Sequence, residues 1–267
     1  TSLRYPDPMR ENLISVLKDY LAVGVDPAQC VIFRQSDNPD HTELAWILNC
    51  MVSVPFLQQA HAYKDKVAKG LEANAGLFTY PMLQAADITL YEAAVVPVGE
   101  DQRQHLEYTR EAVGKLNRAY HAELLTAPQE LILEGVGIVP GLDGEKMSKS
   151  KGNTIPLFGT PAEIEQAVKR IVTDSTGERP VHVYAIHRLL KSAAELEPVY
   201  ETHRGQYGAL KELLAADLIA YTEPMRARRA AISDEDVKAV LADGLTRARA
   251  ISSQTLARVR DAIGISI

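Results

Sequence analysis

Cysteine is scarce in this chain of 267 residues, which contains only two, Cys30 and Cys50. Each lies in an apolar stretch, QCVIF and WILNCMV, and their spacing is not that of metal-binding cysteines. The sequence therefore predicts two buried thiols in a reducing compartment.

Long apolar runs and the commoner phosphate- and metal-binding motifs are also missing. No stretch approaches membrane-spanning length and no signal peptide opens the chain, so the expected location is the cytosol. The patterns GxGxxG, HExxH, paired CxxC, and GxxxxGK followed by Ser or Thr do not occur. The common nucleotide loops and zinc sites are therefore excluded, and no protein metal site is predicted.

What is present is an ordinary globular composition, with 46% hydrophobic and 24% charged residues. The length suits one large domain or two smaller ones. Acidic residues number 35 and basic residues 29, which gives a formal net charge of −6. Any polyanionic ligand must therefore meet a local basic patch.

The first 120 residues alternate between helical and strand patterns. Apolar residues recur at helical spacing after Asp7-Pro8 until Gly24, and HTELAWILNCMV (41–52) is also helical. QCVIFR (29–34) has the continuous apolar character of a buried strand. This alternation favours a mostly parallel α/β sheet.

The pattern continues with a helix, a strand and a long helix. Pro81 fits the first turn of a helix over 81–93. AVVPVG (94–99) predicts a strand, and EDQRQHLEYTREAVGKLNRAY (100–120) a long helix.

The second half of the chain predicts only amphipathic helices. Thr160-Pro161 followed by Glu163 indicates a helix cap with an acidic first turn. We expect an α/β domain over residues 1–158 and an all-helical domain over 159–267.

Asp87 stands out because apolar residues surround it on a helix that should be buried. Burying an unpaired carboxylate costs several kcal/mol, roughly, so Asp87 must have a partner. Gln84 and Tyr91 lie one helical turn away. Asp87 is either a structural residue bonded to a neighbour or a hydrogen-bond acceptor aimed into a pocket.

A second constellation, VVPVGEDQRQH, joins the end of a strand to the start of a helix. Val96 and Val98 share one face of the strand, and Gly99 lets the chain approach a ligand. Ligands of open α/β sheets bind at such strand ends. An acidic cap explains Glu100 and Asp101 equally well, but it does not explain Gln102.

Two lysine-rich segments form the third constellation, YKDKVAKG (63–70) and EKMSKSKGN (145–153). Each alone is typical of a solvated loop. Together at one sheet edge they would suit a polyphosphate, whose leaving group gains charge as it departs.

The order of these motifs resembles a known enzyme family. KMSKS at Lys146–Ser150 is identical to the second signature of class I aminoacyl-tRNA synthetases. GLFTYPMLQAADITLYEAAVVPVGEDQRQHLEYTRE resembles the core of the bacterial tryptophanyl-tRNA synthetases, and AYKDKVAKG resembles their mobile lysine loop. VTDST and GQYGALKELLA extend the similarity over most of the chain. The resemblance implies a Rossmann-like sheet followed by a helical anticodon-binding domain.

The resemblance implies a tryptophan site on the first part of the chain. Asp87 would accept the indole N–H, which suits a nitrogen that only donates. Tyr80 and Gln102 would hold the α-ammonium group, with Val96 and Val98 against the ring. Gln84 also belongs to this site, although the family usually has Met there, and the amide could alter specificity or bond Asp87.

It also implies an ATP site. Gly99, Glu100 and Asp101 would lie along the ribose, and the backbone of Ile138 or Val139 would contact adenine. Lys146, Ser148 and Lys149, with Lys66 opposite, would bind the triphosphate and carry the catalysis, and Met147 and Ser150 complete the loop. We expect Mg²⁺ on the ATP phosphates and no protein cage for it.

For tRNA, the candidates are Lys211, Arg226, Arg228 and Arg229, although a solvated helix face explains each arginine equally well. The resemblance implies a ligase that forms tryptophanyl-adenylate and charges tRNA(Trp), and a homodimer. A tyrosyl-type synthetase and a catalytically silent tRNA-binding paralogue are the alternatives. The HIGH-type motif and glycine-rich first strand of class I are absent from residues 1–267 and are expected upstream of Thr1.

Overall fold

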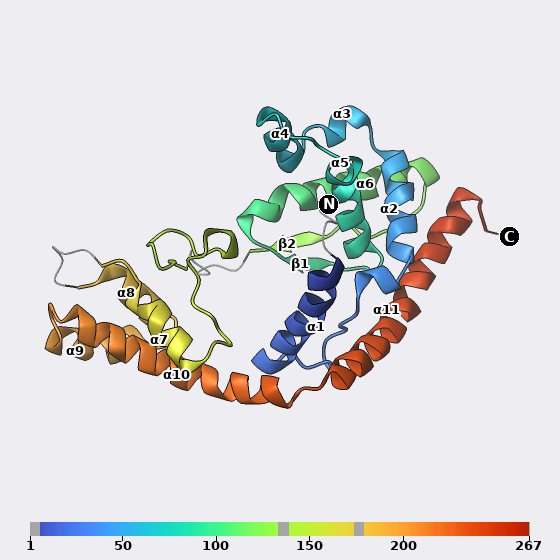
Figure 1. Cartoon of the computed structure of the whole chain (residues 1–267). Helices are drawn as coiled ribbons and strands as arrows, with labels where there is room; N and C mark the ends of the chain where they lie inside the picture. The colour runs from blue at the N-terminus through green and yellow to red at the C-terminus, as the bar shows by residue number, and fades with distance from the viewer. Residues whose placement is uncertain (1–5, 133–138, 174–178, 267) are drawn as a thin grey trace. The chain divides into compact units, whose positions relative to one another are not determined.

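The computed structural model describes residues 6–132, 139–173 and 179–266 (Figure 1). The chain divides into two compact units, and each is described by itself. The first comprises Thr1–Asn12, Asp26–Glu134 and Asp234–Ile267, and the second Leu13–Val25 and Gly135–Ser233. No helix in the described ranges is long and apolar enough to cross a membrane.

The first unit is a small parallel sheet with helices packed beside it. α2, α5 and α6 pack on one another, and α6 also contacts β2 (Figure 1). Its core is built from apolar residues of these helices, including Leu44, Met82 and Leu116, which are fully buried. In chain order its elements are the 3-10 helix η1 (Gln35–Asp37), α2 (Asp40–Met51), α3 (Val54–Leu57), α4 (His61–Ala68), α5 (Ala75–Thr89), β1 (Val95–Pro97), η2 (Glu100–Gln102), α6 (Arg103–Tyr120), β2 (Gln129–Leu131) and α11 (Asp234–Ile263).

Three predicted helices are confirmed. α1 (Pro6–Val23) ends at Gly24, whose φ of +105° suits glycine. α2 covers the predicted segment 41–52 almost completely. The predicted helix 100–120 is α6 preceded by one 3-10 turn.

The predicted start of α5 is wrong. The helix begins at Ala75 rather than Pro81, because the side chain of Asn74 accepts the Leu77 N–H at 2.8 Å and caps it there. Pro81 lies inside the helix and is buried. The Asn cap seven residues before Pro81 outweighed the preference of proline for a first turn.

The sheet pairs β1 with β2 in parallel, with Val96 opposite Glu130. The predicted strand 94–99 is confirmed as β1, and the α/β class with helices in the second half is confirmed as well. The predicted strand 29–34 is wrong, because these residues have irregular backbone. The backbone of Ile32 packs against α11 instead of a strand: a Cβ on Gly244 would lie 1.8 Å from the Ile32 carbonyl oxygen.

The prediction of two buried thiols is also wrong, since both cysteines are exposed. Cys30 lies in the irregular segment, where no strand directs it inward. Cys50 lies four residues after Trp46 on α2, so the two share the solvent face, and Trp46 is 70% exposed.

In its described part, the second unit consists of helices, the connections between them and EKMSKSKGN (145–153), which we call the lysine loop. α7 packs against α10, and α7, α8 and α10 enclose a core around Ile164 and Leu214. Thr160 and Glu163 form the predicted capping box. Its elements are the 3-10 helix η3 (Lys149–Lys151), α7 (Pro161–Lys169), α8 (Val181–His187), α9 (Ala193–Thr202) and α10 (Tyr207–Ala231). The predicted functional domains, 1–158 and 159–267, stay a prediction.

Candidate active site

Asp87 has the partners that the sequence required, but they come from another part of the chain. His41 Nδ1 lies 2.6 Å from Asp87 Oδ1, and Gln35 Nε2 donates to both carboxylate oxygens at 2.7 and 2.9 Å. The Asp87 side chain is 36% exposed, so the carboxylate is still open to a ligand. Among the described residues its hydrogen bonds come from Gln35 and His41, and Gln84 makes none of them.

His41 continues this contact into a buried polar cluster. Its Nε2 lies 2.8 Å from the Tyr91 hydroxyl, which also accepts from Asn38 Nδ2 at 3.1 Å. His41 is only 3% exposed and Asn38 1%. Burial raises the pKa of Tyr91, which keeps its hydroxyl protonated. Sequence reasoning missed His41, Gln35 and Asn38, although a histidine inside an apolar helix was a signal.

The other predicted tryptophan residues lie in the same unit. Tyr80 is on α5 and its hydroxyl lies 2.5 Å from His105 Nε2 on α6, a partner that the sequence did not suggest. Burial raises the pKa of Tyr80. Val96 and Val98 are both half-buried on one face of β1 and its continuation, whereas Val95 is exposed. Gln84, on α5, is half-buried too.

The predicted ribose residues form the turn that joins β1 to α6. Gly99 precedes η2, and Gln102 immediately precedes α6. Glu100 pairs with Arg103 at 3.0 Å, which is the contact of an acidic helix start. Only the backbone of Asp101 is described. This turn thus follows the carboxyl end of a parallel strand, as predicted.

The lysine loop is held in a defined shape by Asn153. Pro140 pairs with Lys146 in an antiparallel bridge, and the Met147 N–H donates to the Val139 carbonyl at 2.8 Å. Asn153 is 4% exposed; its Oδ1 accepts the Ser148 N–H at 2.7 Å and its Nδ2 donates to Asp143 Oδ1 at 2.7 Å. The hydrogen bond from Asn153 lowers the pKa of Asp143.

In this shape the side chains of the predicted catalytic lysines are accessible to an anion. Lys146 and Lys149 are exposed, and Lys149 begins η3. Lys66 lies near the end of α4, in the other unit. Their joint action on a triphosphate stays a prediction. Ile138 and the side chain of Ser150 lie outside the described residues.

The predicted tRNA residues are engaged within the second unit. Lys211 Nζ donates to the carbonyls of Lys169 and Ile171 at 2.9 and 2.6 Å, and burial lowers its pKa. Arg228 donates to the Ala22 carbonyl, and Arg229 to Asp19. Arg226 bonds Thr222 at 2.7 Å and pairs with Glu223. These contacts favour structural roles, and binding of tRNA by them stays a prediction.

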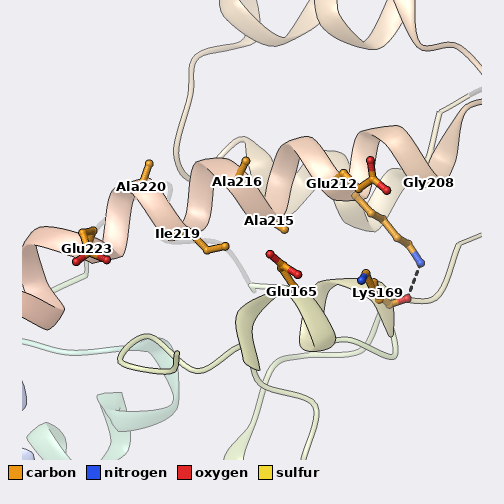
Figure 2. A pocket seen from close by; sticks show the side chains of 10 residues that line it. Glu165, Lys169, Gly208, Glu212, Ala215, Ala216, Ile219, Ala220 and Glu223 are labelled. Atoms are coloured by element: carbon orange, nitrogen blue, oxygen red, sulfur yellow. Dashed lines mark hydrogen bonds between the residues drawn. The ribbon is translucent and has the colours of Figure 1, made fainter. Parts of the chain in front are cut away.

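Two hollows lie in the second unit. A groove of about 830 Å³ lies between α7 and α10. In Figure 2, Glu165 of α7 lies opposite Ala215 and Ile219 of α10. Of the predicted site residues only Lys211 lines it. A smaller apolar cavity of about 230 Å³ lies behind the lysine loop and is lined in part by Val139 and Met147. The described residues contain no cluster of three His, Cys, Asp or Glu side chains suited to a metal ion.

The strand that ends in the GEDQ turn, Asp87 on the preceding helix and the KMSKS loop carry the resemblance to class I aminoacyl-tRNA synthetases, and the family comparison bears it out. The chain belongs to this class, and within it to the family described as tRNA synthetases class I (W and Y), whose model matches residues 4–243.

Two curated relatives are named tryptophan–tRNA ligase. The Fusobacterium nucleatum protein is 41% identical over 275 residues, which cover 99% of this chain and 85% of the relative. The Rhodopirellula baltica protein is 40% identical over 279 residues, covering 99% and 86%. A crystal structure of tryptophanyl-tRNA synthetase from Campylobacter jejuni, complexed with ADP and tryptophan, superimposes with a TM-score of 0.90 at 34% identity and covers 97% of this chain and 84% of that one.

Proposed function

We propose that the chain is a tryptophan–tRNA ligase that uses ATP. The observation that carries this proposal is Asp87, a partly exposed carboxylate held by His41 and Gln35, in a family described as the class I synthetases for W and Y. The curated relatives support the choice of tryptophan.

The reaction has two transfers. The carboxylate oxygen of tryptophan attacks the α-phosphorus of ATP, and the bond to the bridging oxygen breaks, which releases pyrophosphate. A hydroxyl of the terminal ribose of tRNA then attacks the acyl carbon, and AMP leaves. The protein contributes positioning and charge stabilisation, so no covalent enzyme intermediate is needed.

Each residue set has one task in this scheme. Asp87 accepts the indole N–H, with Tyr80 and Gln102 at the α-ammonium group. The turn from Gly99 to Asp101 lies along the ribose. Lys146, Ser148 and Lys149, together with Lys66, meet the charge that builds on pyrophosphate as it leaves. Mg²⁺ enters as part of the ATP substrate.

The other partners follow from the same proposal. tRNA(Trp) is the acceptor, and the protein acts in the cytosol as a homodimer. These statements rest on the relatives and on the proposed reaction rather than on a contact within the chain.

Pyrophosphate exchange tests the proposal. The full natural chain, incubated with ATP and labelled pyrophosphate, is expected to incorporate label into ATP when tryptophan is present and far less with tyrosine. Exchange stimulated only by tyrosine would show a tyrosyl-type enzyme. Absence of exchange with both, with tRNA binding retained, would show the silent paralogue.

A further inference from the structure

The buried polar cluster around His41 links Asp87 to residues that no part of the proposed reaction uses. Five side chains belong to it beside Asp87: His41, Tyr91, Asn38, Ser252 and Asp40, and all six lie in the first unit. Buried polar atoms destabilise a fold unless each of them has a hydrogen-bond partner. The directions of its hydrogen bonds therefore carry information.

Those directions can be derived from one backbone amide. The Asp40 N–H, which can only donate, bonds Asn38 Oδ1 at 3.3 Å and so fixes the orientation of the Asn38 amide. Asn38 Nδ2 then donates to the Tyr91 hydroxyl at 3.1 Å and to Ser252 Oγ at 2.9 Å. The Ser252 hydroxyl in turn donates a hydrogen bond to Asp40 Oδ2 at 2.6 Å.

The same logic fixes the tautomer of His41. Because Tyr91 accepts from Asn38, its hydroxyl proton is available to the imidazole Nε2 at 2.8 Å. The ring then carries its proton on Nδ1, which donates to Asp87 at 2.6 Å. This is the neutral form in which each bond has one donor and one acceptor, since the other tautomer would set a lone pair against an ionised carboxylate.

The result is a chain of donors that all point at Asp87. With Gln35, two side chains donate to its oxygens, so both of these neighbours use the carboxylate as an acceptor. The Asp87 side chain remains 36% exposed, which leaves it accessible to a ligand. A carboxylate of fixed orientation accepts a hydrogen bond from a ring N–H, but it forms no such bond with a ring of the same shape that lacks the N–H.

We propose that His41 is a positioning residue for amino-acid specificity, because its Nδ1–H holds Asp87 as an oriented acceptor for the substrate's ring N–H. The inference rests on the proposed function and adds residues that do not touch the substrate. Tyr91 and Asn38 act through His41 by fixing its tautomer.

The experiment compares tryptophan with its benzothienyl analogue, in which sulfur replaces the ring N–H. The measured quantity is the ratio of kcat/KM values in pyrophosphate exchange with the full natural chain. His41→Leu is expected to lower this ratio about tenfold or more by raising the KM for tryptophan, while the KM for ATP stays unchanged. His41→Asn, whose amide can donate from nearly the same place as Nδ1, is expected to restore much of it.

Two further variants separate positioning from folding. Tyr91→Phe leaves the ring and its packing but removes the donor to Nε2, so the ratio is expected to fall less than in His41→Leu. His187→Leu is the matched control: His187 is 1% exposed and contacts Asp217 at 2.7 Å and Tyr200 at 3.2 Å. It is expected to lower thermal stability and leave the ratio unchanged.

The outcomes distinguish the two proposals. If the natural chain does not activate tryptophan, the proposed function and this inference both fail. If it does, and folded His41→Leu keeps the natural ratio within about twofold, only the inference fails. Should His41→Leu not fold, an unchanged ratio in Tyr91→Phe overturns the inference, and a lowered ratio in Tyr91→Phe with a nearly natural ratio in His41→Asn supports it.

Discussion

Asp87 and Lys149 are the residues whose tasks differ most in the proposed reaction. Asp87 is anchored by His41 and open on one side, whereas Lys149 is exposed on a loop. Asp87→Ala is expected to raise the KM for tryptophan strongly with little change in kcat. Lys149→Ala is expected to lower kcat of activation by about a hundredfold, because it removes charge stabilisation from the transition state.

Steady-state exchange kinetics measure both parameters for each variant. Lys151→Ala is the control, since Lys151 is exposed in the same 3-10 helix but lies outside KMSKS. Equal changes in KM and kcat in both site variants would contradict the division of tasks.

Asn153 determines the shape of the lysine loop more than the lysines do. It is buried and bonds the Ser148 amide, the Asp143 carboxylate and the Lys146 carbonyl. Asn153→Ala leaves these groups without that partner, so local opening of the loop becomes easier. We expect faster tryptic cleavage after the loop lysines and slower activation with an unchanged KM for tryptophan.

Limited proteolysis followed by mass spectrometry measures the cleavage rate at each lysine. Asn49→Ala is a suitable control, because among the described residues Asn49 donates to its own helix, at the Ala45 carbonyl. Loop cleavage at the natural rate in Asn153→Ala would show that Asn153 does not hold the loop.

At the scale of elements, α8 and α9 are joined by one carboxylate. Glu197 accepts from Arg179 at 3.0 and 2.5 Å and from the Tyr184 hydroxyl at 2.6 Å. The Arg179 contact, followed by that of Tyr184, lowers the pKa of Glu197 from its ordinary value of 4.5 to about 2.

The pH dependence follows from this pKa. The unfolded chain binds a proton at Glu197 near pH 4.5, whereas the folded chain does so only near pH 2, so stability falls as the pH decreases between these values. Above pH 4.5 the contribution is fully present. Thermal melts of Glu197→Gln are expected to start lower at pH 7 and to decline less steeply towards acid pH.

Glu201→Gln provides the comparison on the same helix. Glu201 is 58% exposed at its side chain and pairs with Arg204 at 3.4 Å. It is expected to keep the natural acid slope. An unchanged slope in Glu197→Gln would mean that the network does not link α8 and α9.

The helices and strands also show where sequence patterns suffice to predict secondary structure. Helical periods predicted α1, α2 and α6, because an amphipathic helix repeats its own pattern along the chain. The pattern misplaced the start of α5, where Asn74 and Pro81 offered two competing signals. It also took residues 29–34 for a strand, since an apolar run does not reveal what will cover it.

At the scale of the whole chain, Gly244 brings a late helix against an early segment. A Cβ there would lie 1.8 Å from the Ile32 carbonyl oxygen and 2.6 Å from its carbon, and both are backbone atoms. Gly244→Ala is therefore expected to destabilise the protein by more than about 2 kcal/mol.

Denaturant unfolding measures the loss, and Gly208→Ala is the control. Gly208 also lies in a helix, but a Cβ there meets nothing within 4 Å, so the substitution is expected to be neutral or slightly stabilising. Stability of Gly244→Ala within about 0.5 kcal/mol of the natural protein would contradict the close contact.

The sequence by itself determined the family, the helical second half, the strand that ends in the GEDQ turn and the need of Asp87 for a partner. All of these depend on residue type and spacing along a short stretch. Only the tertiary structure decided which partners Asp87 has, since Gln35 and His41 lie 52 and 46 residues away from it. It also decided that Asn38 meets Ser252 across 214 residues. Such contacts depend on which elements pack together, and a single sequence carries no periodic signal of which distant residues will meet.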